Sequence, residues 1–220
     1  MSKKAIVLIS GGMDSLVTTA IAKNEGYELY GLHLNYKQRT EKKELKSFKH
    51  ISHFYHIRKT LVVDVAYLSQ IGGSALTDKK IPILGSSFQD IPMTYVPFRN
   101  THIIAIAVSW AEVIGAEKIF IGAVEEDSSG YPDCREDYYQ AYNQLIEVGT
   151  KPKTHIKIIT PLIHMSKKEI VIKGHELGAP FHLSWSCYSN SHKACGVCDS
   201  CRLRLKGFQE ANLKDPIPYK

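Results

Sequence analysis

The segment AIVLISGGMDS at residues 5–15 decides the fold. Its first five residues form an uninterrupted apolar run, which is typical of a strand buried on both faces of a parallel sheet. Residues 15–23 then follow a helical period that Gly26 ends. Between the two elements, the glycine pair allows a tight turn and close approach to an anion, and the free N–H groups of a helix start bind phosphate oxygens. The segment therefore predicts a strand, a phosphate-binding loop and a helix.

The same alternation of strand and helix runs through most of the chain. It predicts an α/β fold, a doubly wound parallel sheet with helices on both faces, because successive βαβ units place their strands in parallel. Residues 64–93 have weak periodicity and are expected to be a long irregular excursion. The further predicted strands are residues 29–34, 60–63, 118–121 and 156–159, and the further predicted helices are residues 41–55, 101–114, 135–148 and 166–177.

The composition indicates one globular domain with a small appendage. The chain has 220 residues, of which 44% are hydrophobic and 23% charged, enough for a full core. We place the boundary near Pro180, between a domain that carries the phosphate-binding loop (1–180) and a cysteine-rich module (181–220). No run approaches the roughly 18 apolar residues of a membrane span, and the first residues lead straight into a strand, so a cytoplasmic protein without a membrane segment is expected.

The formal net charge of +6 favours anionic ligands. Much of the excess lies in residues 41–58, where lysines repeat at helical spacing around Leu45 and Phe48. That arrangement is typical of an ordinary solvated helix face. We therefore interpret it as a solvated surface rather than a nucleic-acid site.

Residues 10–15 carry the chemistry of the first loop. Ser10 and Ser15 add hydroxyl donors to the backbone amides, and Asp14 is expected to reach a magnesium ion or to cap the helix. The loop is not a Walker A motif, since no lysine follows at the required spacing. A glycine turn without a ligand is the alternative, but the complete string SGGMDS between a strand and a helix favours phosphate.

Four of the five cysteines are grouped near the end of the chain: Cys187, Cys195, Cys198 and Cys201. Their spacing suits a tetrahedral zinc site with four sulfur ligands, and a closed shell of this kind is structural rather than catalytic. We expect one zinc ion per chain; an iron–sulfur cluster and unligated buried thiols are the alternatives. Cys134 stands apart, and no histidine adjoins it, so we interpret it as a packed thiol.

The loop string resembles the signature of the PP-loop, or N-type, ATP pyrophosphatases, which cradle the pyrophosphate of ATP while a substrate oxygen attacks the α-phosphate. Over nearly its whole length the chain resembles the family of 7-cyano-7-deazaguanine synthases. The resemblance rests on the loop, the cysteine set, and the segments NYKQR at residues 35–39, VPFRN at residues 96–100 and DSSGYPDCR at residues 127–135.

This resemblance implies an adenine nucleotide hydrolase-like fold and ATP-dependent conversion of 7-carboxy-7-deazaguanine and ammonia to the nitrile, through an activated carboxylate and an amide. It implies ATP with Mg²⁺, ammonia taken from solution, and a homodimer. Asp14 and Arg99 are the expected catalytic residues. The expected ATP-binding residues are Leu8, Ile9, Ser10, Gly11, Gly12, Met13, Asp14, Ser15, Leu16, Val17 and Thr18; the expected substrate-binding residues are Arg39, Arg99, Asn100, Tyr131 and Asp133.

Individual roles follow from side-chain chemistry. Arg39 or Lys37 is expected to act as a charge clamp, and Arg99 to pair bidentately with a carboxylate or phosphate. Asp133 is expected to accept from the N–H edge of the base, and Tyr131 to stack on it. The family usually has glycine before the Arg-Asn pair, where this chain has Phe98. We expect a bulky residue to be unable to share a glycine-only backbone angle, so that the local path differs.

Two other functions compete with this reading. A tRNA-modifying PP-loop ATPase, for thiolation or lysidine formation, would suit the positive charge, but the sequence shows no appended RNA-binding domain and no reactive cysteine pair beside the loop, so sulfur transfer would depend on Cys134 alone. A non-enzymatic nucleotide or nucleic-acid binder with a zinc module would leave Arg99 without a purpose. The sequence leaves open whether the product serves queuosine or archaeosine, which nucleotide products are released, and which residue acts as general acid or base.

Overall fold

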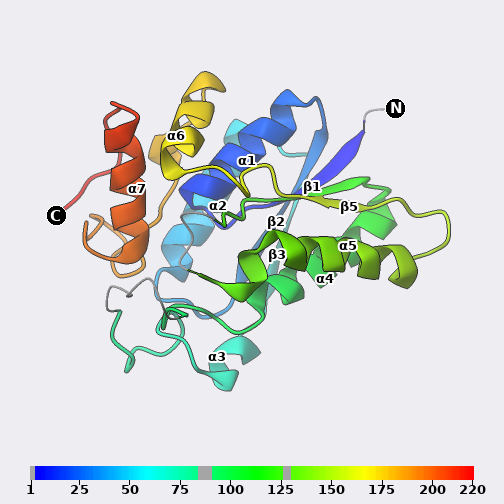
Figure 1. The fold of residues 1–220 in the computed structure, drawn as a ribbon, viewed down its shortest axis with the longest axis horizontal. Helices are drawn as coiled ribbons and strands as arrows, with labels where there is room; N and C mark the ends of the chain where they lie inside the picture. Colours follow the sequence, from blue (N-terminus) through cyan, green and yellow to red (C-terminus); the bar gives the residue numbers. More distant parts are fainter. Residues whose placement is uncertain (1–2, 84–90, 126–129) are drawn as a thin grey trace.

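The computed structural model describes residues 3–83, 91–125 and 130–220 (Figure 1). Residues 127–129 of the DSSGYPDCR segment, and residues 84–90 of the predicted irregular excursion, therefore lie outside the described residues.

A parallel sheet of five strands, in the order β3-β2-β1-β4-β5, forms the centre of the molecule. Strand β1 pairs with β2 on one side and with β4 on the other, so the strand order reverses at β1. This confirms the doubly wound parallel sheet. The strands are β1 (Lys4–Leu8), β2 (Glu28–Asn35), β3 (Lys59–Asp64), β4 (Lys118–Ile121) and β5 (Lys157–Ile159).

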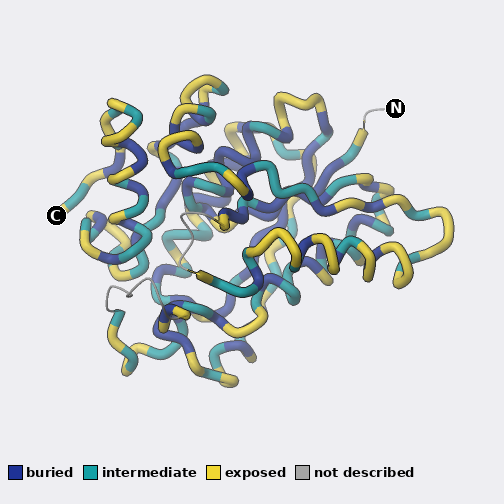
Figure 2. The backbone as a smooth tube through the Cα atoms, viewed as in Figure 1, coloured by how far each residue is buried: buried dark blue, intermediate teal, exposed yellow. Residues whose placement is uncertain are grey.

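Helices cover both faces of the sheet, and the alternation of side chains along β1 shows why. Val7 and Ile9 belong to the apolar core that includes residues of α1, α2 and α6, whereas Ile6 and Leu8 belong to the core that includes residues of α4 and α5. Figure 2 shows the buried strands enclosed between more exposed helices. The helices of these two layers are α1 (Met13–Asn24), α2 (Glu41–Phe54), α4 (Arg99–Ile114), α5 (Glu136–Gly149) and α6 (Lys167–Glu176).

The predicted elements are all present, with ends that shift by one or two residues. Two helices were not predicted. The first, α3 (Tyr67–Ile71), lies inside the segment expected to be irregular, and five residues are too few to show a helical period. The second, α7 (Asp199–Glu210), lies in the cysteine-rich module. Two 3₁₀ turns follow at Pro132–Cys134 and Phe181–Leu183. Within residues 3–83, 91–125 and 130–220, no helix has both the length and the apolar character that crossing a bilayer requires.

The C-terminal segment packs on α6 through α7 (Asp199–Glu210). A Cβ atom at Gly207 would lie 2.8 Å from the Cβ of Lys167, so the two helices approach at a glycine. Phe208 enters the main core beside α1 and α6, while a second small core surrounds Cys187, Cys198 and Cys201. We therefore retain residues 181–220 as a proposed metal module, one that shares part of its core with the remaining chain.

A buried ion pair fixes the tail of this module. Arg204 and Asp215 have side chains that are 1% and 4% exposed, and the guanidinium donates to both carboxylate oxygens at 2.7 and 2.9 Å. Tyr219 donates to the same carboxylate at 2.6 Å. A buried carboxylate with several donors is compensated for its lost hydration, so residues 215–219 are held against α7.

Phe98, the residue before α4, contradicts one expectation. Its φ and ψ are 58° and 21°, in the left-handed region, which the sequence analysis had reserved for glycine. The expectation was wrong because this region is only mildly unfavourable to a residue with a Cβ atom, by about 1–2 kcal/mol. The Phe98 residue is 56% exposed, and its N–H donates to the Tyr95 hydroxyl at 2.9 Å.

Phe98→Gly is consequently expected to keep the fold and to change the free energy of unfolding by no more than about 1 kcal/mol, with stabilisation favoured. Relief of the left-handed strain is offset by about 0.5–1 kcal/mol from the greater freedom of glycine in the unfolded chain. Urea unfolding measures the difference. Phe98→Ala is the matched control, since it removes the ring but keeps the Cβ atom. A loss above 2 kcal/mol in both variants would show that the ring itself stabilises the fold.

Candidate active site and metal centre

A cavity of about 260 Å³ lies beyond the carboxyl ends of β1, β2 and β4, where the strand order reverses. This is the usual ligand position in open α/β sheets. Its walls come from the loop between β1 and α1, the segment after β2, the first turn of α4, the residues after β4 and the metal module. The cavity thus brings together segments that are distant in the sequence.

The glycine-rich loop has the shape of a phosphate cradle. Gly11 has a φ of +94°, and a Cβ atom there would lie 2.7 Å from the Glu44 carbonyl oxygen, so only glycine fits. The Ser10 hydroxyl accepts from Gly12 N–H at 3.2 Å and donates to the Ser15 hydroxyl at 3.1 Å. Ser15 in turn donates to the Gly12 carbonyl at 3.0 Å. These bonds hold two hydroxyls and the α1 N-terminus at the cavity wall.

The predicted ATP-binding residues divide between the cavity and the core. Leu16, Val17 and Thr18 are fully buried, and the first two are part of the apolar core. They lie in the interior and do not line the cavity, because a helix turns 100° per residue and consecutive residues of α1 cannot all face one ligand. Gly11 does not line the cavity, but its backbone angle and its close approach to Glu44 set the path of the loop. The residues that line the cavity are Leu8, Ile9, Ser10, Gly12, Met13, Asp14 and Ser15.

Asp14 forms an ion pair that the sequence analysis did not anticipate. Its Oδ2 atom accepts from Lys167 Nζ at 2.9 Å, and the Lys167 side chain is only 6% exposed. Oδ1 is buried without a hydrogen-bond partner in the described part of the chain. The N-cap of α1 is Gly12, and no side chain caps it, so the alternative of a helix cap is not realised. An unsatisfied carboxylate oxygen beside the phosphate loop fits a divalent cation.

Lys167 was missed because 153 residues separate it from Asp14. A local signal does mark its position: Ser166 and Glu169 form a capping box, with Ser166 accepting from the Glu169 N–H, and such a pair places a helix N-terminus at this point. The direction in which that terminus points depends on how α6 packs.

Arg99 lies at the first turn of α4 and faces the cavity. Its guanidinium donates to the Tyr36 hydroxyl at 3.1 Å and to Asn100 Oδ1 at 3.3 Å, and it lies 5.5 Å from the centre of the Tyr36 ring. Burial raises the pKa of Tyr36 to about 12, so this phenol stays neutral near pH 7. Arg99 therefore brings a positioned cation to the cavity, with neutral hydrogen-bond partners.

Asp133 occupies a different place from the one expected. It is 3% exposed, and its Oδ2 accepts from the Asn100 N–H at 3.0 Å. The Asn100 amide donates to the Asp133 carbonyl at 2.7 Å and to Cys134 Sγ at 3.4 Å. Asp133 is not among the residues that line the cavity, so the geometry gives its predicted contact with a base no support. Its carboxylate instead satisfies an unpaired amide at the start of α4.

The other predicted substrate residues lie at the cavity wall. Tyr131 lines it, with its hydroxyl 2.8 Å from Thr94 Oγ1. Arg39 also lines it, donates to the Asp78 carbonyl at 3.0 Å, and keeps a buried Nε atom without a partner among the described residues. Lys37 is exposed and lies outside the lining. Burial raises the pKa of Cys134 to about 11, which agrees with a packed thiol.

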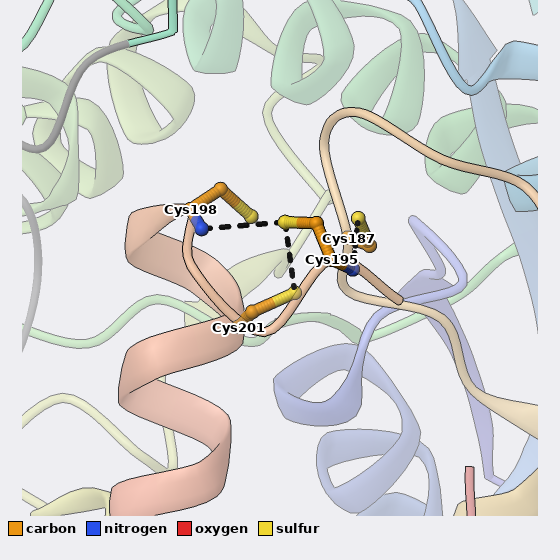
Figure 3. Close-up of side chains that lie close together, drawn as sticks. All are labelled: Cys187, Cys195, Cys198 and Cys201. Carbon is orange, nitrogen blue, oxygen red and sulfur yellow. Dashed lines mark hydrogen bonds between the residues drawn. The ribbon is translucent and has the colours of Figure 1, made fainter. Parts of the chain in front are cut away.

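The four clustered cysteines converge, as Figure 3 shows. Their sulfur atoms all lie within 4.8 Å of one another, and those of Cys195 and Cys201 are 3.9 Å apart. A tetrahedral zinc shell with bonds of about 2.3 Å requires sulfur separations of roughly 3.8 Å. Backbone amides of Asn190 and Cys195 donate to Cys187 Sγ at 3.4 and 3.3 Å, which favours thiolates. The residues therefore fit a metal with four sulfur ligands.

Sequence comparison identifies relatives over the whole chain. A family model described as queuosine biosynthesis protein QueC matches residues 4–212. The chain is 62% identical over 219 residues to a 7-cyano-7-deazaguanine synthase from Chlorobium phaeobacteroides, covering 99% of this chain and 97% of the relative. A protein of the same name from Chloroherpeton thalassium is 60% identical over 219 residues, with coverage of 99% and 97%.

Solved structures support the fold at lower identity. A 4-thiouridine synthetase, solved with RNA and bound ATP, has a TM-score of 0.52 and 19% identity, covering 96% of this chain and 50% of that one. An NMN synthetase from Francisella tularensis has a TM-score of 0.50 and 12% identity, covering 97% of this chain and 88% of that one. These structures share the fold of this chain. The sequence match is more specific, and it shows that the chain belongs to the QueC family of queuosine biosynthesis proteins.

Proposed function

We propose that this protein converts 7-carboxy-7-deazaguanine, ammonia and ATP into 7-cyano-7-deazaguanine, in queuosine biosynthesis. The observation that carries the proposal is the meeting of the glycine-rich loop, Lys167 and Arg99 around connected cavities, in a chain 62% identical to a protein named for this product. A phosphate loop and a half-buried guanidinium at the same cavity together suit a reaction between ATP and a carboxylate.

The first half-reaction activates the carboxylate. Its oxygen attacks the α-phosphorus of ATP, the bond to the β-phosphate oxygen breaks, and pyrophosphate leaves. Ammonia then forms a bond to the carboxyl carbon, the adenylate leaves as AMP, and a proton is released to give the amide. Loop amides and the hydroxyls of Ser10 and Ser15 are placed to hold phosphate oxygens, and Arg99 to orient the carboxylate.

The second half-reaction repeats the activation on the amide oxygen. Adenylation makes that oxygen a leaving group, and loss of AMP with two protons from nitrogen leaves the carbon–nitrogen triple bond. One cavity serves both steps because the same carbon stays in place while its oxygen substituent changes.

Two metals complete the proposal. The free Oδ1 of Asp14 is proposed to bind Mg²⁺, which neutralises phosphate charge when it is present. The cysteine cluster is proposed to hold one zinc ion in a closed, structural shell. Ammonia from solution and a homodimeric assembly also belong to the proposal.

The competing function, modification of tRNA by a PP-loop ATPase, makes an opposite prediction about RNA. Purified protein with ATP, Mg²⁺, ammonium chloride and 7-carboxy-7-deazaguanine is expected to yield the nitrile, detected by mass spectrometry, without RNA. The product gains one nitrogen atom from ammonia and loses both carboxylate oxygen atoms, one with each AMP, so substrate and product differ clearly in mass. Product formation only in the presence of tRNA would reject the proposal.

Arg99→Lys tests the cation in the cavity. Lysine keeps the charge but loses the planar fork that pairs two oxygens at once, so kcat/KM for the carboxylate substrate is expected to fall by roughly an order of magnitude or more. Steady-state kinetics measure this. Arg58→Lys is the matched control, because Arg58 is 70% exposed in its side chain. Wild-type kinetics in Arg99→Lys would show that the guanidinium serves only to hold Tyr36.

A further inference from the structure

The metal module forms part of the wall of the substrate cavity. Trp185, Ser186 and Tyr188 line the cavity, and they stand on either side of Cys187, a member of the cysteine cluster. Ser200 lines it as well and precedes Cys201. Cavity residues and metal-ligand candidates therefore alternate along the chain, which ties the position of the wall to the cluster.

Tyr188 is the lining residue most closely joined to that cluster. It follows Cys187 directly, and its backbone amide hydrogen-bonds to the Cys198 thiol. Its side chain packs against the apolar group around Leu34 and Tyr36, and also against the small core of the metal module. The residue is thus an aromatic group that bridges the cavity and the metal centre.

Four aromatic residues line the main cavity, and three already have partners for their rings. The Arg99 guanidinium lies over Tyr36 at 5.5 Å, and the Lys43 ammonium over Trp185 at 4.3 Å. Tyr131 lies 5.5 Å from the Tyr95 ring, and its hydroxyl contacts Thr94. Tyr188 packs against the same apolar groups as Tyr36 and Trp185, but in the part of the chain that the structure describes its ring takes part in no stacked or edge-on ring pair and no cation–π contact. It also lines the smaller cavity of about 140 Å³ that adjoins the first.

We propose that Tyr188 is the aromatic residue that packs on the deazapurine ring, and that the metal centre holds it in position. The proposal rests on the proposed function and deepens it. A flat heterocycle gains favourable contact from an aromatic ring, and Tyr188 is the lining aromatic residue whose ring makes no stacking or cation–π contact among the described residues. It assigns to Tyr188 the stacking role that the sequence analysis gave to Tyr131.

Binding measurements without catalysis test this assignment. Isothermal titration calorimetry with 7-carboxy-7-deazaguanine is expected to show at least tenfold weaker binding to Tyr188→Leu, and binding within threefold of wild type to Tyr188→Phe, which keeps the ring. The Kd for ATP is expected to stay within twofold in both, with unchanged zinc content. Tyr67→Leu is the matched control, since Tyr67 is 45% exposed and contacts His102 instead of the cavity.

Partial removal of the metal with a chelator tests whether the metal centre holds Tyr188 in position. Affinity for the deazapurine is expected to fall in proportion to metal content and to return when zinc is restored, while ATP binding persists. Wild-type affinity of Tyr188→Leu, or a larger loss in Tyr131→Leu, would overturn the assignment. Full affinity in metal-depleted protein would overturn the positioning by metal. Failure of wild type to bind or convert the carboxylate would instead reject the proposed function.

Discussion

Asp14→Asn is expected to lower kcat/KM for ATP at least about 100-fold, a loss typical of a group that stabilises charge in the transition state. Asn keeps the size and one acceptor oxygen but loses the charge that pairs with Lys167 at 2.9 Å. It also weakens the free Oδ1 site, because Mg²⁺ prefers anionic oxygen ligands. Both the Lys167 ammonium and the proposed Mg²⁺ would then be poorly held.

The ion pair adds a stability effect to the loss of activity. Asp14→Ala removes the carboxylate that accepts from the Lys167 ammonium, in a pair whose side chains are 6% and 31% exposed, and removing one partner of an ion pair destabilises by about 3 kcal/mol when the pair is fully buried. Asp14→Asn is therefore the sharper test of function, and Asp14→Ala is expected to show the greater decrease in melting temperature.

ATP turnover and thermal unfolding of these variants separate the two effects. Asp137→Asn is a control for charge removal at the start of another helix, since Asp137 lies in the first turn of α5. It is expected to behave as wild type. Unchanged ATP kinetics in Asp14→Asn, with native stability, would contradict the assignment of the loop to phosphate binding.

Cys198→Ser is expected to release the metal and to loosen the module. Half of the buried residues in the small core around the cluster are cysteines, and the others are Trp185, Ala194 and Ile217. Apolar burial alone therefore gives the module little stability. Metal binding couples to folding in such segments. A loss of about 3 kcal/mol would lower the melting temperature by roughly 6–12 °C in a chain of this size.

Elemental analysis and thermal unfolding check the result. Cys134→Ser is the matched control, because this thiol stands outside the group of four and is expected to retain one zinc ion per chain. Full zinc occupancy in Cys198→Ser would mean that the ligand set is different, and iron in the wild-type protein would mean that the cluster is of another kind.

Local patterns were enough to predict the layers of the fold and to mark two candidate ligand sites. Apolar runs such as residues 5–9 and helical periods such as residues 41–55 follow from burial on a sheet and on one helix face. The glycine loop and the cysteine set are also local, because each binding group lies within a few residues of the next. The position of β1 at the reversal of strand order agrees with these patterns.

Tertiary packing decided which side chains share the cavity. Lys167 reaches Asp14 across 153 residues only because α6 packs beside α1. Asp133 has the chemistry to bind a base but caps α4 instead, and Tyr188 reaches the cavity through the fold of the cysteine cluster. Sequence states which groups a chain can offer, whereas the direction of each side chain depends on contacts between segments that are far apart along it. Phe98 shows the same limit for the backbone, since its left-handed angle is tolerated where an exposed side chain meets no obstruction.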